Sequence, residues 1–335
     1  MIEKTPAPDP SPYDQEIDIL KGFLTVSMIL SHAISVMGNF GSNVSVTALS
    51  TALQLQSFYG FAFAFGFTTQ LSYFSRASLD PFKIVRTILR IVGAFYVSAI
   101  AAAILFEKKP SLEKIFSILV FNHIPLLSEF IIAFALFLVM AVLLMRPIAW
   151  LLQRPIYFLL VNIVLLACTF LPVQNVQSTY LGLFIGTTQF SAYPVVQYFP
   201  LFLLGAYFAF HKIKAHLLAL LICVAGVVVV ELLLPWWGIP VRFPPSLGWI
   251  LSSVPFVLFW YFFSRYSGKV PFLAPWLARI GTNSLFFLLI SNLFFLTLPL
   301  ILGQNFTFKY VVIITIALVA LIYYLTTIVR VARHE

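Results

Sequence analysis

Ten apolar runs of 16 to 23 residues dominate the sequence. A helix needs about 20 mostly apolar residues to cross the hydrocarbon core of a bilayer, and its backbone groups pair within the segment itself. The runs are continuous, whereas the strands of a membrane β-barrel show short alternating segments. We therefore predict an all-α fold, a polytopic transmembrane bundle of about ten helices at 19–37, 52–74, 88–106, 126–145, 156–173, 195–210, 217–236, 247–263, 281–301 and 309–329.

The composition favours the same class of protein. Of the 335 residues, 61% are hydrophobic and 9% are charged, whereas a soluble domain carries about 25% charged residues. This balance excludes a soluble enzyme, a nucleic-acid-binding domain and a disordered chain. The formal net charge of +9 is interpreted as loop Lys and Arg that set the topology, and no nucleic-acid partner is expected.

Basic residues are unevenly distributed between alternate loops. With the N-terminus inside, 14 Lys and Arg residues lie on the inner side and 5 on the outer side, with Lys21 at a helix start. The positive-inside rule then places both termini in the cytoplasm. We expect a polar cytoplasmic segment at 1–18, a transmembrane domain at 19–330 and a cytoplasmic tail at 331–335. Residues 1–18 lack the features of a cleaved signal peptide.

Ionisable residues on the first predicted helix are the strongest candidates for chemistry, because charge inside a membrane is costly. Lys21 and His32 are eleven residues apart, which returns a helix to within about 20° of the same face and separates the two by roughly 16 Å. Asp18 lies one turn before Lys21. An imidazole can act as a general base near neutral pH. The alternative is a snorkelling lysine with a structural histidine.

A basic group surrounds the start of the third predicted helix, and it consists of Arg76, Lys83, Arg86 and Arg90. Arg86 and Arg90 are four residues apart and share one helical face. Two guanidinium groups placed in this way suit phosphate oxygens, so an anionic nucleotide-containing donor on the cytoplasmic side would fit. The group could instead determine topology or contact anionic lipids.

A third group is expected near the outer surface, and it consists of His123, Glu129, Glu231 and Arg242. Buried carboxylates require partners, and Glu129 could orient His32 if their helices touch. The two acids could also be structural. The two cysteines lie in apolar runs, which excludes a disulfide framework and a cysteine-based zinc site, and no metal site is predicted.

The first helix resembles the opening of the membrane acyltransferase-3 family, whose members begin with an acidic residue, a hydrophobic pair, Arg-Gly and a histidine eleven residues after the arginine. Here the stretch reads Asp18-Ile19-Leu20-Lys21-Gly22, with His32 in register. Later segments resemble the family in the same order, namely FAFAFGFTTQLSYFSR, KIVRTILRI, YFPLFLLGAYFAF and IGTNSLFFLLISN. The stretch RFPPSL is also similar to a segment of heparan-glucosaminide N-acetyltransferase-like membrane proteins.

The resemblance implies an integral membrane O-acyltransferase of the bacterial cytoplasmic (inner) membrane. It would move an acyl group, expected to be acetyl, from a cytoplasmic coenzyme A thioester to a hydroxyl of a cell-surface glycan or glycolipid. The expected partners are acyl-CoA as co-substrate, the acceptor and membrane lipids, with no bound cofactor. Two departures are Lys21 in place of the usual arginine and Ser291 in place of a second histidine.

The resemblance also implies roles for individual residues. The expected catalytic residues are His32 and Glu129, and the expected donor-binding residues are Lys21, Arg86 and Arg90. Structural or orienting roles are expected for Asp18, Asn283 and Ser284. Two other hypotheses stay open, a transporter or flippase for a glycan or lipid precursor and a scaffold that has lost catalysis.

Overall fold

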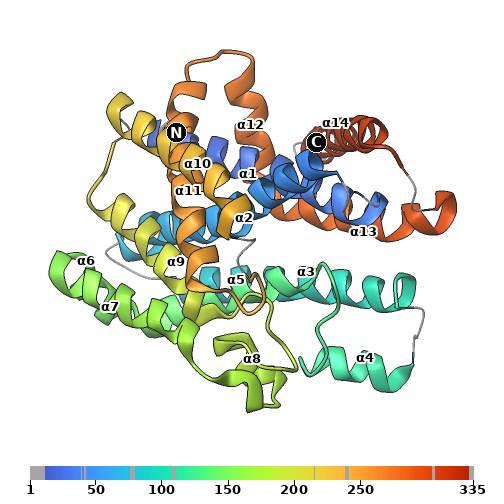
Figure 1. The fold of residues 1–335 in the computed structure, drawn as a ribbon, viewed down its shortest axis with the longest axis horizontal. Helices are drawn as coiled ribbons and strands as arrows, with labels where there is room; N and C mark the ends of the chain where they lie inside the picture. The colour runs from blue at the N-terminus through green and yellow to red at the C-terminus, as the bar shows by residue number, and fades with distance from the viewer. Residues whose placement is uncertain are drawn as a thin grey trace, which may run out of the picture.

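The computed structural model describes residues 12–38, 40, 43–75, 80–107, 111–214, 216–237, 241–303 and 306–331. Every regular element in these ranges is helical, which confirms the all-α prediction (Figure 1). The helices are α1 Pro12–Met37, α2 Val44–Thr69, α3 Pro81–Leu105, α4 Leu112–Leu119, α5 Glu129–Leu143, α6 Met145–Leu152, α7 Pro155–Ala167, α8 Thr179–Ile185, α9 Val195–Phe210, α10 Leu217–Trp237, α11 Leu247–Ser267, α12 Leu273–Thr282, α13 Ser284–Leu302 and α14 Phe308–Val331.

Single-turn elements complete this fold. A π-helical turn, Gln70–Phe74, continues α2, and two short 3-10 turns, Cys168–Phe170 and Val173–Asn175, follow α7. Residues 1–11 and 332–335, which belong to the predicted terminal segments, and Arg76 of the predicted basic group lie outside the described residues.

Four helices in the described part of the chain are long and apolar enough to cross a membrane, namely those that span Gln15–Met37, Pro81–Leu105, Leu247–Ser267 and Phe308–Ile328. The number rises to six if each of two bent pairs forms one span, α5 with α6 at 79° and α12 with α13 at 77°. Other apolar helices, such as Val195–Phe210, are shorter. These lengths indicate a multi-pass membrane protein. The prediction of about ten spans exceeds this number because several apolar segments form short or bent helices.

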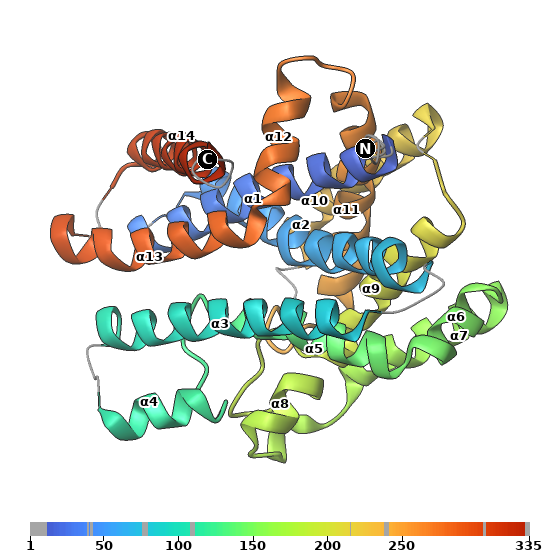
Figure 2. The same ribbon diagram turned by 180° about the vertical axis from the view of Figure 1, so that it is seen from behind.

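Helix α1 occupies the centre of the bundle and packs against α2, α11, α12, α13 and α14. Helix α2 in turn packs against α9 and α11, and the interior is filled by large buried side chains such as Phe63, Phe137 and Trp249. Helix α3 contacts α5 and α13, and α4 lies alongside it away from the centre, as Figure 2 shows. Any side chain on the inward faces of α1 is therefore enclosed by several helices.

The contact between α1 and α12 is a backbone contact made possible by two glycines. A Cβ atom on Gly22 would lie 2.2 Å from the carbonyl oxygen of Leu277, and one on Gly281 would lie 1.8 Å from the carbonyl oxygen of Asp18. Small residues allow helices in membranes to approach this closely. The contact brings the end of α12, and hence the start of α13, against the turn of α1 that carries Lys21.

Replacement of Gly22 by alanine is expected to lower the melting temperature of the purified protein in detergent. The added methyl group meets backbone, which cannot rotate away, so α1 and α12 must separate, at a cost of about 1–3 kcal/mol. The matched control is Gly93→Ala in α3, where no heavy atom lies within 4 Å of the new Cβ. Helix propensity favours alanine there by about 1 kcal/mol. Equal melting temperatures for the two variants would contradict the packing argument.

Candidate functional site

A cavity of about 260 Å³ lies between the second half of α1, the first half of α2 and the start of α5. We call it the His32 cavity, and it is lined by Met28, Ser31, His32, Ser35, Val36, Gln54, Ser57, Phe58, Leu126, Leu127, Glu129, Phe130, Tyr193, Arg242 and Phe243. Ser35 and Leu126 are exposed, so the cavity reaches the molecular surface at the C-terminal end of α1. Hydroxyl, amide, imidazole, carboxyl and guanidinium groups therefore share one small space.

A chain of hydrogen bonds holds the His32 imidazole in place. His32 Nδ1 lies 2.9 Å from Asn292 Oδ1, and Asn292 Nδ2 donates to the carbonyl oxygen of Leu127 at 2.9 Å. Because a carbonyl can only accept, the Asn292 amide must present its oxygen to His32, and His32 Nδ1 must carry the proton. The remaining nitrogen, Nε2, then has the free lone pair that a general base requires.

The backbone at Leu127 is held in an unusual conformation at this point. Leu127 has a φ of 65°, in the left-handed region that residues other than glycine rarely adopt. Its carbonyl oxygen also accepts a hydrogen bond from Ser98 on α3, at 3.4 Å. Strained backbone of this kind is found at functional sites, where the surrounding structure holds it in place. The strain fits a role for Leu127 in positioning Asn292.

Glu129, at the first turn of α5, lines the same cavity as His32. The sequence assigned the orientation of His32 to this carboxylate. In the structure His32 Nδ1 instead donates its hydrogen bond to Asn292 Oδ1, because α13 lies directly against α1. Glu129 is half-buried and is placed to contact a molecule that occupies the cavity.

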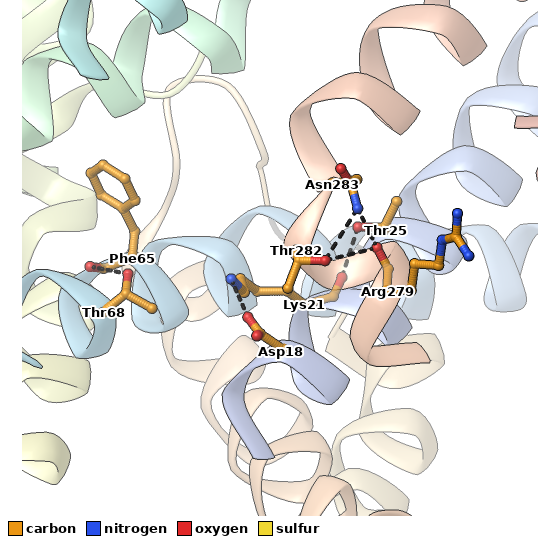
Figure 3. A network of polar contacts seen from close by, with 8 residues as sticks. All are labelled: Asp18, Lys21, Thr25, Phe65, Thr68, Arg279, Thr282 and Asn283. Carbon is orange, nitrogen blue, oxygen red and sulfur yellow. Dashed lines mark hydrogen bonds and ion pairs between the residues drawn. The ribbon is translucent and has the colours of Figure 1, made fainter. Parts of the chain in front are cut away.

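A second cavity, of about 520 Å³, lies at the other end of α1. We call it the Lys21 cavity, and its polar lining consists of Asp18, Lys21, Thr68, Ser72, Thr87, Thr282 and Ser284. Lys21 Nζ and Asp18 Oδ1 form an ion pair at 2.6 Å, with about a fifth of each side chain exposed. Figure 3 shows both side chains directed toward Phe65 and Thr68 of α2, while Arg279 points away on the other side. Lys21 therefore offers a cation to this cavity.

The two cavities meet at Phe130. This residue lines both of them, is 3% exposed, and its ring centroid lies 6.2 Å from that of His32. On α2 the linings are separated by less than one turn, since Phe58 belongs to one cavity and Phe61 to the other. Lys21 and His32 thus line two separate cavities, and Phe130 is the residue that the two linings share.

Arg86 and Arg90, the arginines predicted to bind the donor, do not line the Lys21 cavity. The residues of α3 that line the Lys21 cavity are Thr87 and Ile91, and each arginine precedes one of them in the chain. Neighbouring side chains on a helix point about 100° apart, so the arginines point away from the cavity that Thr87 and Ile91 line. Both arginines are exposed. The structure therefore brings Lys21, but neither arginine, into the cavity.

Two further predicted positions lie at the bend between α12 and α13. Asn283 Nδ2 donates to the carbonyl oxygen of Arg279 at 2.9 Å, which caps the end of α12, and Ser284 lines the Lys21 cavity. In this structure Asn283 thus satisfies a carbonyl group at a helix end. Neither residue reaches His32, because the residue of α13 that contacts His32 is Asn292, about two helical turns farther along the helix.

His123 and Glu231 lie apart from both cavities in the described residues. His123 Nε2 contacts Glu107 at 3.1 Å, and Lys114 forms an ion pair with the same carboxylate. Burial raises the pKa of Glu107, but hydrogen bonds from Lys114 and His123 outweigh burial and hold that pKa below its usual value. Glu231 is half-buried on α10, and its Oε1 atom has no partner among the described residues.

Sequence reasoning missed Asn292, Gln54 and Tyr193. Asn292 was detectable in principle, because an amide in the middle of an apolar span requires a partner. It also lies four residues after Leu288, so the face of α13 that lines the Lys21 cavity also carries the hydrogen-bond partner of His32. Gln54 and Tyr193 enter the site only through tertiary packing.

No family profile, curated protein or solved structure matches the chain.

Replacement of Asn292 by leucine is expected to lower the free energy of unfolding by about 1–3 kcal/mol, because the Leu127 carbonyl and His32 Nδ1 lose their partner inside the protein. The control is Asn283→Leu, which removes an amide at the partly exposed end of α12 and should cost less. Both variants are compared with the parent by thermal unfolding in the same detergent. A larger loss for Asn283→Leu would show that the His32–Asn292–Leu127 chain contributes little to stability.

Proposed function

We propose that this protein is an integral membrane O-acyltransferase that moves an acyl group, expected to be acetyl, from a coenzyme A thioester to a hydroxyl of a glycan or glycolipid. The observation that carries the proposal is the His32 imidazole, held by Asn292 in the tautomer of a base, in a cavity next to a second cavity that holds Lys21. The donor enters at Lys21 and the acceptor at His32. The resemblance of the first helix to the acyltransferase-3 family supports the same activity.

In the proposed reaction His32 Nε2 takes the proton of the acceptor hydroxyl as its oxygen attacks the thioester carbonyl. The C–O bond forms, the tetrahedral intermediate collapses, and the C–S bond breaks. The thiolate that leaves receives the proton from the imidazolium, which restores His32. Asn292 keeps the ring in one orientation throughout, because its Oδ1 accepts from Nδ1 in both protonation states.

Lys21 is proposed to attract the phosphate-containing donor, with Arg86 and Arg90 as exposed cations on neighbouring α3. Its ion pair with Asp18 reduces the charge available, so the contribution of Lys21 is mainly positioning. Glu129 is proposed to accept a hydrogen bond from the acceptor. For transfer, the Phe130 ring must move aside so that the thioester end of the donor reaches the His32 cavity.

The proposal includes a bundle of about ten spans in a bacterial inner membrane, with both termini in the cytoplasm. Single cysteines at Thr188 and Lys269, both exposed, should then react with an impermeant maleimide from opposite sides of oriented vesicles. Cys168 and Cys223 are first replaced by serine and alanine, and the doubly substituted protein without new cysteines is the control. Labelling of both positions from the same side would overturn the arrangement.

Replacement of His32 by alanine is expected to lower acyl transfer about 10²–10⁴-fold, the usual contribution of general acid–base catalysis. His32→Asn can still donate to Asn292 but cannot carry the proton, so it should be equally inactive. The measurement is transfer of labelled acetyl from acetyl-CoA to extracted envelope glycolipids by purified, folded protein. His123→Asn, away from both cavities, is the matched control. Parent-like rates in both His32 variants would exclude this mechanism.

The alternative function is a transporter or flippase for a glycan or lipid precursor. The specific observation in its favour is that two cavities, each with some polar side chains, share Phe130 in their linings, as a substrate path with a central gate would. Hydrolysis or transfer of the acyl donor by the purified protein separates the two functions. A transporter leaves the thioester intact and moves the precursor between vesicle leaflets.

A further inference from the structure

Arg242 lies in the turn before α11 and lines the His32 cavity. Its Nη1 donates to Gln54 Oε1 at 2.9 Å and its Nη2 donates to the Tyr193 hydroxyl at 2.8 Å. The guanidinium carbon lies 4.5 Å from the centre of the Phe243 ring. Three separate segments therefore hold this side chain in one position.

The partners that hold Arg242 are neutral. The Gln54 amide is fixed by a second hydrogen bond from its Nε2 to Ser50, at 3.1 Å, so its oxygen faces the arginine. Burial raises the pKa of the Tyr193 phenol and the nearby Arg242 charge only partly offsets this, so the hydroxyl stays protonated. Among the described residues the ion pairs are Asp18–Lys21, Glu107–Lys114, Glu107–His123 and Glu16–Arg265, and Arg242 belongs to none of them.

The geometry leaves hydrogen-bonding capacity on Arg242. A guanidinium has five N–H groups in a planar fork, and two are used by Gln54 and Tyr193, so three have no partner among the residues that the structure describes. A half-buried guanidinium that forms no direct ion pair with the described residues, held in the wall of a cavity of about 260 Å³, can bind carboxylate or phosphate oxygens. Glu129 lines the same cavity, so its carboxyl group offsets part of the Arg242 charge and can accept hydrogen bonds from hydroxyl groups.

We propose that Arg242 binds an anionic group, a carboxylate or a phosphate, on the molecule whose hydroxyl faces His32. The acceptor is then an anionic polyhydroxyl compound, such as a sugar acid, a sugar phosphate or an anionic lipid headgroup. The description of this molecule as the acceptor rests on the proposed function, but the anion site itself does not depend on catalysis. Arg242 fixes the anion, and the distance across the cavity selects which hydroxyl reaches the imidazole.

The decisive variant is Gln54→Glu. It has the same shape as the parent but places a carboxylate against Nη1, which gives Arg242 a counter-ion and removes its attraction for other anions. The fold should be preserved, since the contact is kept. Arg242→Gln removes the cation altogether. The matched control is Arg154→Gln, because Arg154 also lies over an aromatic ring, that of Trp150 at 4.8 Å, but lines neither cavity.

The test measures binding without any acyl donor, by the shift in melting temperature of the full-length protein in maltoside micelles. The probes are glucuronate, glucose 6-phosphate and neutral glucose, and a second arm compares nanodiscs of phosphatidylglycerol with nanodiscs of phosphatidylcholine. We expect the parent and Arg154→Gln to bind at least one anionic probe about tenfold more tightly than its neutral counterpart. Gln54→Glu and Arg242→Gln should lose this preference. The probe that binds identifies a soluble sugar or a lipid headgroup as the source of the anion.

Equal binding of anionic and neutral probes by the parent would overturn the proposal, as would an undiminished anion preference in Gln54→Glu. If Arg242→Gln does not fold, Gln54→Glu decides the result alone. Anion binding together with an absence of acyl transfer would leave the Arg242 site standing and would count against the proposed function instead. The two proposals can thus fail separately.

Discussion

The backbone contact between α1 and α12 determines where the polar residues of this protein meet. It requires glycine on both helices, at Gly22 and Gly281, and places the α12–α13 bend beside Lys21. Because α13 leaves that bend at 77° and then runs against α1, its side chains follow the same stripe of α1 toward the other end of the bundle. Asn292 reaches His32 as a result, and a single helix–helix contact thereby positions both the residues around Lys21 and the hydrogen-bond partner of His32.

The general character of the fold was accessible from sequence, because lipid imposes simple rules on length and hydropathy. Spacing alone also placed Lys21 and His32 on one face of one helix, and in the structure both line cavities. The positions of Arg86 and Arg90 were not accessible in this way. Their spacing showed that they share a face of α3, but which face turns inward depends on α5 and α13, which pack against the helix.

The His32 cavity illustrates the same limit for a polar site. Its charged and hydrogen-bonding groups come from α1, α2, the start of α5 and two loops, and the partner of His32 on α13 lies 260 residues away in the sequence. No local pattern encodes such a combination. The left-handed backbone at Leu127 and at Tyr193 is equally invisible in sequence, since neither residue type favours that conformation. Packing and hydrogen bonding impose it after the helices assemble.

The position of Phe130 between the two cavities determines how a membrane voltage would act on the proposed transfer. If water from opposite sides of the membrane fills the two cavities along the proposed path, a membrane voltage falls mainly across the layer between them, where Phe130 lies, rather than across the full bilayer. A unit charge that crosses the whole potential gains or loses about 2.3 kcal/mol per 100 mV. In an energised membrane, passage of an anionic group past Phe130 would therefore depend on voltage, whereas passage of a neutral group would not.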